Sequence, residues 1–257
     1  MKENFEEWAL SFSGCEGGHD SADIWLAGIE WGFNKKHGES DQEYENRQSD
    51  YYLRELPAEI AAGKFVPRNS YDWQGSLKYT YGRSVAKLIS AIKGLDSHDY
   101  VKNTKSFAPN ELFKVNLYPI AFRESASEHT WQKFNLHTLT GFETKELYKF
   151  WCFHRRFEFF REQITKSTKA PKLIICTGVT HLNEFYTAFA GNKFSPDLRT
   201  HRLKYEVNGK PEERLIYYAH SERQLFVVLP FFSGSSGLNS FASIEGVAEL
   251  IRSNLPQ

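Results

Sequence analysis

Four short apolar segments, each ending at a turn or a polar loop, constrain the fold of this chain most strongly. They are residues 23–29, 112–117, 172–178 and 224–229. Their length and their apolar composition predict strands that are buried on both faces. Helical patterns separate the segments, which predicts an α/β fold with helices on both sides of a doubly wound sheet. We therefore expect a three-layer α/β/α sandwich with a central, mostly parallel four-stranded core sheet.

The intervening segments supply the expected helices and one hairpin. The longest helical pattern spans 143–166, and Thr144 is a suitable N-cap for it. Asn208–Gly209 joins two alternating segments and predicts an inserted β-hairpin. Further helices are expected over 35–48, 50–62, 77–93, 180–190 and 241–253, and the hairpin strands over 201–207 and 214–219.

Composition limits the class of protein. The 257 residues fit one domain, 1–257, and the net charge of zero argues against a dedicated non-specific nucleic-acid binder, though not against a local basic groove. Three widely spaced cysteines predict neither a disulfide framework nor a zinc site. The N-terminus is acidic and amphipathic rather than a signal peptide, and no apolar run is long enough to span a membrane. A cytoplasmic protein without membrane association is expected.

The carboxyl ends of parallel strands are where doubly wound sheets bind ligands, because loops converge there. The first such loop places Glu30 just beyond an apolar strand, beside Trp31 and Phe33. A carboxylate in such surroundings loses solvation, so its pKa can rise and it can act as a base near neutral pH. Alternatively, Glu30 caps a helix or pairs with Lys35 or Lys36. The candidate loops are Gly28–Asn34, Asn116–Arg123, Gly178–His181 and Leu229–Ser240.

Two other loops carry polar groups suited to binding. Asn116 ends a buried strand, and its amide suits recognition of an imide or amide edge, unless it ties adjacent loops together. The loop 229–240 is rich in glycine and serine and opens the helix at Phe241, which is typical of an anion-binding turn. It lacks the lysine of a Walker motif, so an ATP-hydrolysing P-loop is not expected, and a flexible connection is the alternative.

The basic and histidine positions are expected to be structural. His154-Arg155-Arg156 predicts a solvated basic stripe on the long helix, with contact to a phosphate backbone as the alternative. His181 is expected to be a hydrogen-bonded structural histidine. The nine histidines lack the spacing of a metal site, so no metal is predicted.

The order of these loops resembles the uracil-DNA glycosylase superfamily, and most of all its single-strand-selective monofunctional uracil glycosylase branch. Gly28-Ile29-Glu30-Trp31-Gly32 is similar to the family's Gly-x-Asn/Asp-Pro-Gly, and Asn116-Leu117-Tyr118-Pro119-Ile120 to Asn-Tyr-Cys-Pro-Leu. Residues 171–178 resemble the third strand with its glycine. Residues 229–239 resemble the last motif, which begins His-Pro-Ser-Pro. The resemblance covers roughly residues 20–252.

This resemblance implies a base-excision enzyme that needs no cofactor. A uracil or modified base would be flipped out of single- or double-stranded DNA, and its N-glycosidic bond hydrolysed through an oxocarbenium-like sugar. Glu30 would be the catalytic residue and hold the attacking water. The implied base-binding residues are Gly28, Trp31, Gly32, Phe33, Asn116 and Tyr118, and the implied DNA-binding residues are Ser233, Gly234, Ser235, Ser236 and Asn239.

Two departures keep other functions open. Trp31 replaces the family's usual proline, and Leu229 stands where the family has the histidine that stabilises the leaving base. Losing such a donor commonly costs ~10²–10³ in rate. One alternative is a non-catalytic nucleic-acid or nucleotide-binding protein on the same fold. The other is a hydrolase or binding protein for a small phosphorylated metabolite, suggested by the Gly/Ser loop.

Overall fold

The computed structural model describes residues 2–33, 35–108, 110–122, 128–166, 170–191, 198–221, 223–234 and 237–256. The four apolar segments form four adjacent strands of the sheet, and every residue in these strands is buried. They are β1 (Ile24–Gly28), β2 (Leu112–Asn116), β3 (Leu173–Thr177) and β6 (Leu225–Leu229). Burial on both faces explains why these segments are continuously apolar rather than alternating.

The sheet has six strands in the order β2-β1-β3-β6-β5-β4. The first four are parallel, and their carboxyl ends lie at one edge, where Gly28 pairs with Asn116 and Thr177 with Leu229. The predicted parallel core and the predicted hairpin are both confirmed. The hairpin is not separate from the core, because β5 pairs antiparallel with β6 and extends the same sheet.

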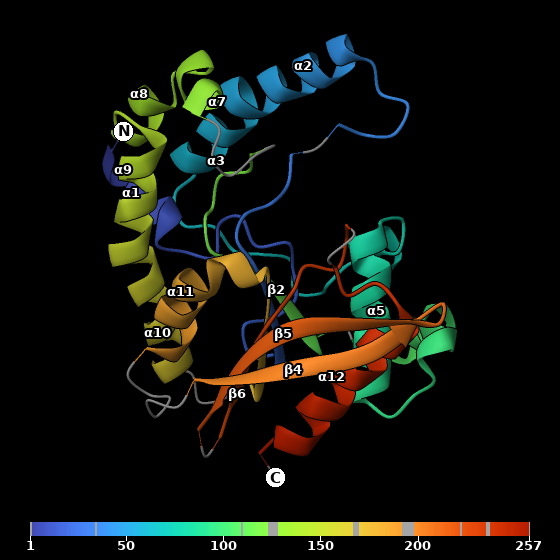
Figure 1. Cartoon of the computed structure of the whole chain (residues 1–257). Coiled ribbons are helices and arrows are strands. Elements are labelled where there is room, and N and C mark those ends of the chain that lie inside the picture. Colours follow the sequence, from blue (N-terminus) through green and yellow to red (C-terminus); the bar gives the residue numbers. More distant parts are fainter. Residues whose placement is uncertain are drawn as a thin grey trace.

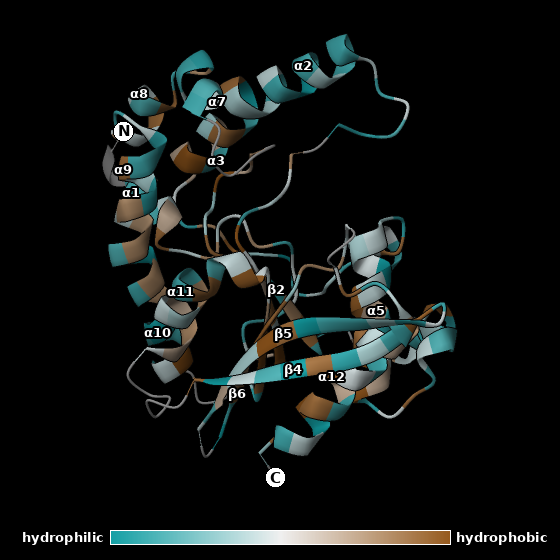
Figure 2. Ribbon diagram, in the orientation of Figure 1, coloured by the Kyte–Doolittle hydropathy of each residue, from teal (hydrophilic) through white to brown (hydrophobic). Residues whose placement is uncertain are grey.

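The hairpin consists of β4 (Arg199–Val207) and β5 (Lys210–His220). Asn208 and Gly209 both have positive φ, 53° and 75°, as a two-residue hairpin turn requires. Figure 2 shows the two strands as largely hydrophilic, in contrast to the apolar parallel strands. Their few buried residues include Leu203, which lies so close to helix α12 (Phe241–Asn254) that a Cβ on Gly246 would be 2.6 Å from its Cδ1.

Helices pack on both faces of the sheet, as Figure 1 shows. One face is covered by α5 (Thr80–Ile92) and α12 (Phe241–Asn254). The other is covered by the predicted long helix, which consists of α9 (Lys145–Trp151), a π-helical turn η4 (Cys152–Arg156) and α10 (Phe157–Lys166). Thr144 caps it, as predicted, by accepting a hydrogen bond from the Leu147 amide at 3.2 Å.

The remaining helices are short. The helix expected over 35–48 begins only at Asp41, because Ser40 and Glu43 form a capping box at that point. Helices within 97–106 and 128–140 were not anticipated from the sequence. The bounds are α1 (Lys2–Ala9), α2 (Asp41–Asp50), η1 (Tyr51–Glu55), α3 (Leu56–Ala61), α4 (Trp73–Ser76), η2 (Ser97–Asp99), α6 (Tyr100–Asn103), η3 (Thr104–Ser106), α7 (Glu128–Lys133), α8 (Leu136–Thr140), η5 (Val179–His181), α11 (Leu182–Phe185) and η6 (Tyr186–Ala190).

The basic stripe expected at His154-Arg155-Arg156 is wrong for Arg156, which is completely buried. The π-helical turn holds one more residue than an α-helical turn, and Arg156 at its end points inward. Its guanidinium donates to backbone carbonyl groups of the N-terminal segment and of the loop after β2. The acceptors are the carbonyl oxygens of Ala9, Ser11, Ser13, Asn116 and Leu117. Arg156 therefore fastens the N-terminal segment to the edge of the sheet where the strands end.

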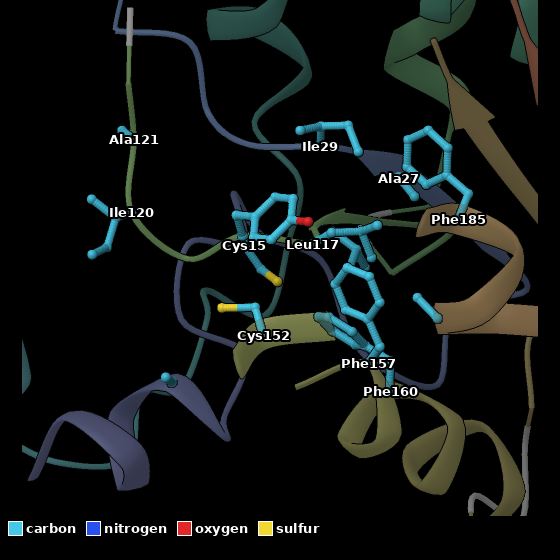
Figure 3. Close-up of a cluster of buried hydrophobic side chains, with 14 of the residues drawn as sticks. Cys15, Ala27, Ile29, Leu117, Ile120, Ala121, Cys152, Phe157, Phe160 and Phe185 are labelled. Carbon is cyan, nitrogen blue, oxygen red and sulfur yellow. The ribbon is translucent and has the colours of Figure 1, made fainter. Parts of the chain in front are cut away.

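All three cysteines are free and buried. Cys15 and Cys152 lie in the same aromatic part of the core as Phe157 and Phe160 (Figure 3). In the part of the chain that the structure describes, no helix has both the length and the apolar character needed to cross a membrane.

Candidate functional site

The loops after β1 and β2 run side by side beyond the sheet. The amides of Leu117 and Tyr118 donate to the carbonyls of Gly28 and Ile29 at 3.0 and 2.8 Å. Further on, the Phe33 amide donates to the Phe122 carbonyl at 2.9 Å. The two loops thus continue the parallel pairing of their strands, and this pairing fixes where the intervening side chains point.

Glu30 lies between these loops and the start of α9. Its carboxylate is 3.8 Å from the Lys145 ammonium, and the two side chains are 8% and 0% exposed. The ammonium also lies 3.4 Å from the centre of the Phe122 ring, a favourable cation–π contact. The partner of Glu30 is therefore neither of the nearby lysines considered from the sequence, and Lys35 pairs instead with Asp41.

Burial moves the pKa values of Glu30 and Lys145 toward each other. Loss of solvation raises the pKa of Glu30 to about 7, while Lys145, Lys149 and His181 oppose the rise. Burial also lowers the pKa of Lys145 to about 8, against the opposing effect of Glu30. A carboxylate with such a pKa is suited to taking up and releasing a proton near neutral pH.

Three tyrosines hold the second loop. The Tyr52 hydroxyl donates to the Ala121 carbonyl at 2.6 Å, and the Tyr51 and Tyr148 hydroxyls accept from the amides of Ala121 and Ile120 at 3.3 Å. Burial raises the pKa of each of these phenols, and the Glu30 charge raises it further. The same holds for Tyr118, which the sequence resemblance includes among the base-binding residues.

Asn116 belongs to a second polar cluster, which we call the Lys114 cluster and define as Glu16, Lys114 and Asn116. The Asn116 amide donates to the Gly14 carbonyl at 2.8 Å and to the Glu16 carboxylate at 3.3 Å. Its oxygen accepts from the Lys114 ammonium at 3.3 Å, and that ammonium is also 3.3 Å from Glu16. Asn116 thus ties adjacent segments together, and reading a base edge would require some of these bonds to be exchanged.

Gly28 makes room for the Lys114 cluster. A Cβ at this position would lie 2.7 Å from the Asn116 side-chain oxygen and 3.1 Å from the Lys114 nitrogen. Both side chains therefore pass directly over the Gly28 backbone, and this glycine is needed for close approach rather than for an unusual φ.

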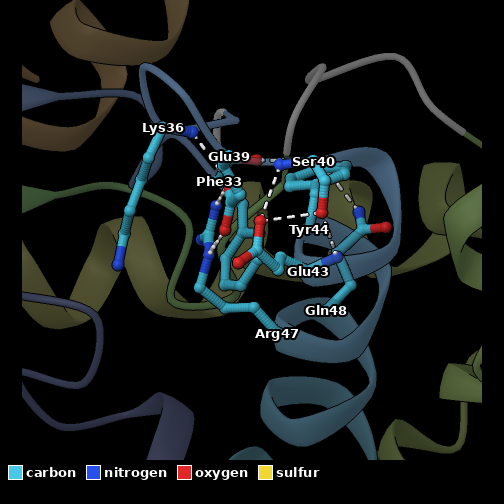
Figure 4. Close-up of polar contacts among 8 residues, drawn as sticks. All are labelled: Phe33, Lys36, Glu39, Ser40, Glu43, Tyr44, Arg47 and Gln48. Atoms are coloured by element: carbon cyan, nitrogen blue, oxygen red, sulfur yellow. Dashed lines mark hydrogen bonds and ion pairs between the residues drawn. The ribbon is translucent and has the colours of Figure 1, made fainter.

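The aromatic residues of the first loop differ in accessibility. Trp31 is half-exposed, whereas Phe33 is buried. The Arg47 guanidinium covers Phe33, 4.6 Å from the ring centre, and is itself held by Glu39 at 2.8 Å (Figure 4). Trp31 rather than Phe33 is therefore available to stack on a ligand. Gly32, between them, forms a bridge with Phe122.

The loop after β6 approaches the Lys114 cluster through Tyr81. The ring centres of Tyr81 and Phe231 are 5.2 Å apart, and the Tyr81 ring centre lies 5.5 Å from the Lys114 ammonium. The Tyr81 hydroxyl is hydrogen-bonded to the Thr177 hydroxyl at 3.2 Å. Phe231 is half-exposed. Beyond it the Asn239 amide donates to the Gly234 carbonyl at 3.2 Å, so this side chain closes its own loop.

The predicted site residues thus gather at the carboxyl edge of the sheet in two clusters. Glu30, Trp31 and Tyr118 belong to the Glu30 side, while Gly28 and Asn116 belong to the Lys114 cluster. Ser233 and Gly234 lie in the loop after β6, and Ser235, Ser236, Asn34 and Arg123 lie outside the described residues. Leu229, the last residue of β6, is completely buried in the core beneath α5 and α12.

Sequence reasoning missed three charged residues, Glu16, Lys114 and Lys145. Lys114 is the one charge within an apolar strand, so it could have been recognised as a buried lysine that needs a partner. Glu16 is flanked by Gly14, Gly17 and Gly18, which lets the segment pack tightly against β2 and face Lys114. Nothing in the sequence distinguishes Lys145 from the other lysines of the long helix.

No group of three His, Cys, Asp or Glu side chains in the described residues comes together as a metal site would require. Comparison of the chain with protein-family models, curated proteins and solved structures finds no match.

Proposed function

We propose that this protein excises uracil or another modified base from DNA by hydrolysing the N-glycosidic bond. The observation that carries the proposal is the placement of Glu30, a nearly buried carboxylate at the carboxyl end of β1, paired with Lys145. Glycosidic bond cleavage passes through a sugar cation, which a carboxylate stabilises while it positions the attacking water. Glu30 is the residue placed to do both.

The arrangement around Glu30 supports this assignment. The parallel core with helices on both faces agrees with the three-layer architecture that the sequence resemblance implies. Half-exposed Trp31 offers an aromatic face beside the catalytic carboxylate for a flipped base. Half-exposed Phe231, in the loop after β6, offers a second stacking surface along the same edge.

We place the recognition of the base over Gly28. The Asn116 amide lies there, held by its hydrogen bonds to Lys114, Glu16 and the Gly14 carbonyl. A polar group on the edge of an incoming base would replace one of these partners of Asn116. The affinity for the base therefore depends on the Lys114 cluster.

The test is base release from a panel of oligonucleotides. Purified protein is incubated with single- and double-stranded DNA that carries uracil, oxidised or deaminated bases, and abasic sites are revealed by alkaline cleavage. The proposal expects abasic sites with at least one substrate. No base release from any member of the panel, in either strand form, would contradict it.

A second candidate is a non-catalytic protein that binds nucleic acid or nucleotides. It is favoured by Leu229, whose complete burial leaves the position of the family histidine without a donor for the leaving base. This candidate expects salt-dependent oligonucleotide binding, because phosphate contacts release counterions, but no abasic product. The panel above distinguishes the two candidates.

A further inference from the structure

Lys145 places a primary amine next to the proposed catalytic carboxylate. Its nitrogen lies 3.8 Å from Glu30, and its side chain is completely buried against the Phe122 ring. It is also the first residue of α9, where the positive end of the helix dipole disfavours an ammonium. A lysine on the protein surface would not combine burial, a neighbouring carboxylate and a position at a helix N-terminus.

The surroundings of Lys145 make its neutral, nucleophilic form easier to reach than that of a surface lysine. Burial lowers its pKa to about 8, and Glu30 is close enough to accept the proton that it releases. A lysine that is desolvated in this way is suited to forming a Schiff base with a carbonyl compound.

The other buried lysine of the site has the opposite environment. Burial alone would lower the pKa of Lys114, but the Glu16 carboxylate and the neighbouring tyrosines Tyr81 and Tyr71 raise it above its ordinary value. Lys114 therefore stays an ammonium that orients Asn116. Of the two, Lys145 is the candidate nucleophile.

We propose that Lys145 forms an imine with the aldehyde of the ring-opened deoxyribose at an abasic site, which gives the protein a strand-cleaving activity beyond base release. This inference rests on the proposed function, because base excision generates that aldehyde. A sugar whose C1′ is placed for attack by water held at Glu30 also lies within reach of the lysine amine, which is adjacent to the same carboxylate.

The chemistry balances without any further reactant. The Lys145 amine adds to the C1′ aldehyde. Glu30 passes the proton it accepted from Lys145 to the resulting hydroxyl group, which leaves as water, so the products are the protonated imine and the Glu30 carboxylate. Glu30 then takes a proton from C2′, and the electron pair moves to break the bond between C3′ and its oxygen, which leaves as the 5′-phosphate end of the downstream strand. Water hydrolyses the remaining imine and returns Lys145 as the free amine.

Borohydride trapping tests the inference directly. The full-length protein is mixed with an oligonucleotide that already contains an abasic site, and sodium borohydride reduces any imine to a stable adduct. The inference expects a protein–DNA adduct, and peptide mass spectrometry should place it on Lys145. An adduct on a different lysine, or no adduct, overturns the inference.

Matched variants separate the role of Lys145 from a general effect of lysines. Lys145→Arg keeps the charge but removes the primary amine, so trapping should fall to the level seen without protein. Lys93→Arg is the control, because Lys93 is also paired with a glutamate, Glu111 at 2.9 Å, but at the opposite edge of the sheet. Glu30→Gln should slow trapping by about 10²-fold or more, since it removes the proton acceptor.

Because the oligonucleotide already contains an abasic site, imine formation is tested independently of base release. Base release without trapping overturns the imine and leaves the glycosylase proposal standing. Trapping on Lys145 without release of any base overturns the glycosylase proposal and leaves the imine. If Lys145→Arg does not fold, judged by urea unfolding, the position of the adduct in the wild-type protein decides the question.

Discussion

Replacing both members of the Glu30–Lys145 pair by methionine should stabilise the folded protein. The pKa of Glu30 is about 7 in the fold and 4.5 ordinarily, and at 1.36 kcal/mol for each pH unit its ionised form costs about 3 kcal/mol. Because the folded-state pKa is raised, this cost is absent below pH 4.5, grows as the pH rises, and is complete above about pH 7.

Lys145 adds a cost of the same kind at neutral pH. Its pKa is about 8 in the fold and 10.5 ordinarily, so the buried ammonium is unfavourable below pH 8 and the cost disappears as the pH rises to 10.5. At 3.8 Å the attraction between the two charges is about 4 kcal/mol at an effective dielectric constant of 20, and both pKa values already include it. Removing both charges should therefore stabilise the protein by about 1–4 kcal/mol.

Urea unfolding at pH 7 of the wild type, the two single variants and Glu30→Met/Lys145→Met measures this effect. Each single variant leaves one buried charge without its partner and should be less stable by about 3–5 kcal/mol. The matched double variant Glu111→Met/Lys93→Met removes a more exposed pair and should change stability by about 1 kcal/mol or less. If the Glu30/Lys145 double variant proves less stable than the wild type, the pair is a structural element and our reasoning about it is refuted.

Three further predictions concern the same edge of the sheet. The rate of base release should fall as the pH drops below about 7, because protonated Glu30 cannot accept a proton from water, and single-turnover rates between about pH 5 and pH 8 would show this fall or its absence. Gly28→Ala should displace the Asn116 side chain, since the new methyl group would lie 2.7 Å from its oxygen, and should cost about 1–3 kcal/mol in urea unfolding. Arg156→Met leaves several buried carbonyls unpaired and should cost about 3 kcal/mol or more, and a loss below about 1 kcal/mol would show that these bonds contribute little.

The strands and their order along the chain could be predicted because the residues of each apolar segment are enough to indicate a buried strand. Burial on both faces demands a continuous apolar run, and Asn208–Gly209 has the positive φ values that a tight hairpin turn needs. The N-cap at Thr144 is similarly local. Features that depend on a few neighbouring residues are visible in the sequence.

The partners of the buried charges could not be predicted, because they come from distant segments. Glu30 was recognised as a buried carboxylate, but its partner Lys145 lies on a helix far along the chain. Arg156 looked like part of a solvated stripe, and a π-helical turn together with the N-terminal segment buries it. Tertiary packing decides which distant residues pair, and the spacing of residues in the sequence does not reveal these pairs.

The single-turnover rate of base release with and without the Glu30 carboxylate tests the central claim most directly. Wild type, Glu30→Gln and the control Glu111→Gln are compared on whichever oligonucleotide the wild type processes, with urea unfolding to verify folding. The account predicts that Glu30→Gln is slower by about 10² to 10⁴-fold while Glu111→Gln keeps the wild-type rate. A folded Glu30→Gln protein that releases the base at the wild-type rate would contradict it.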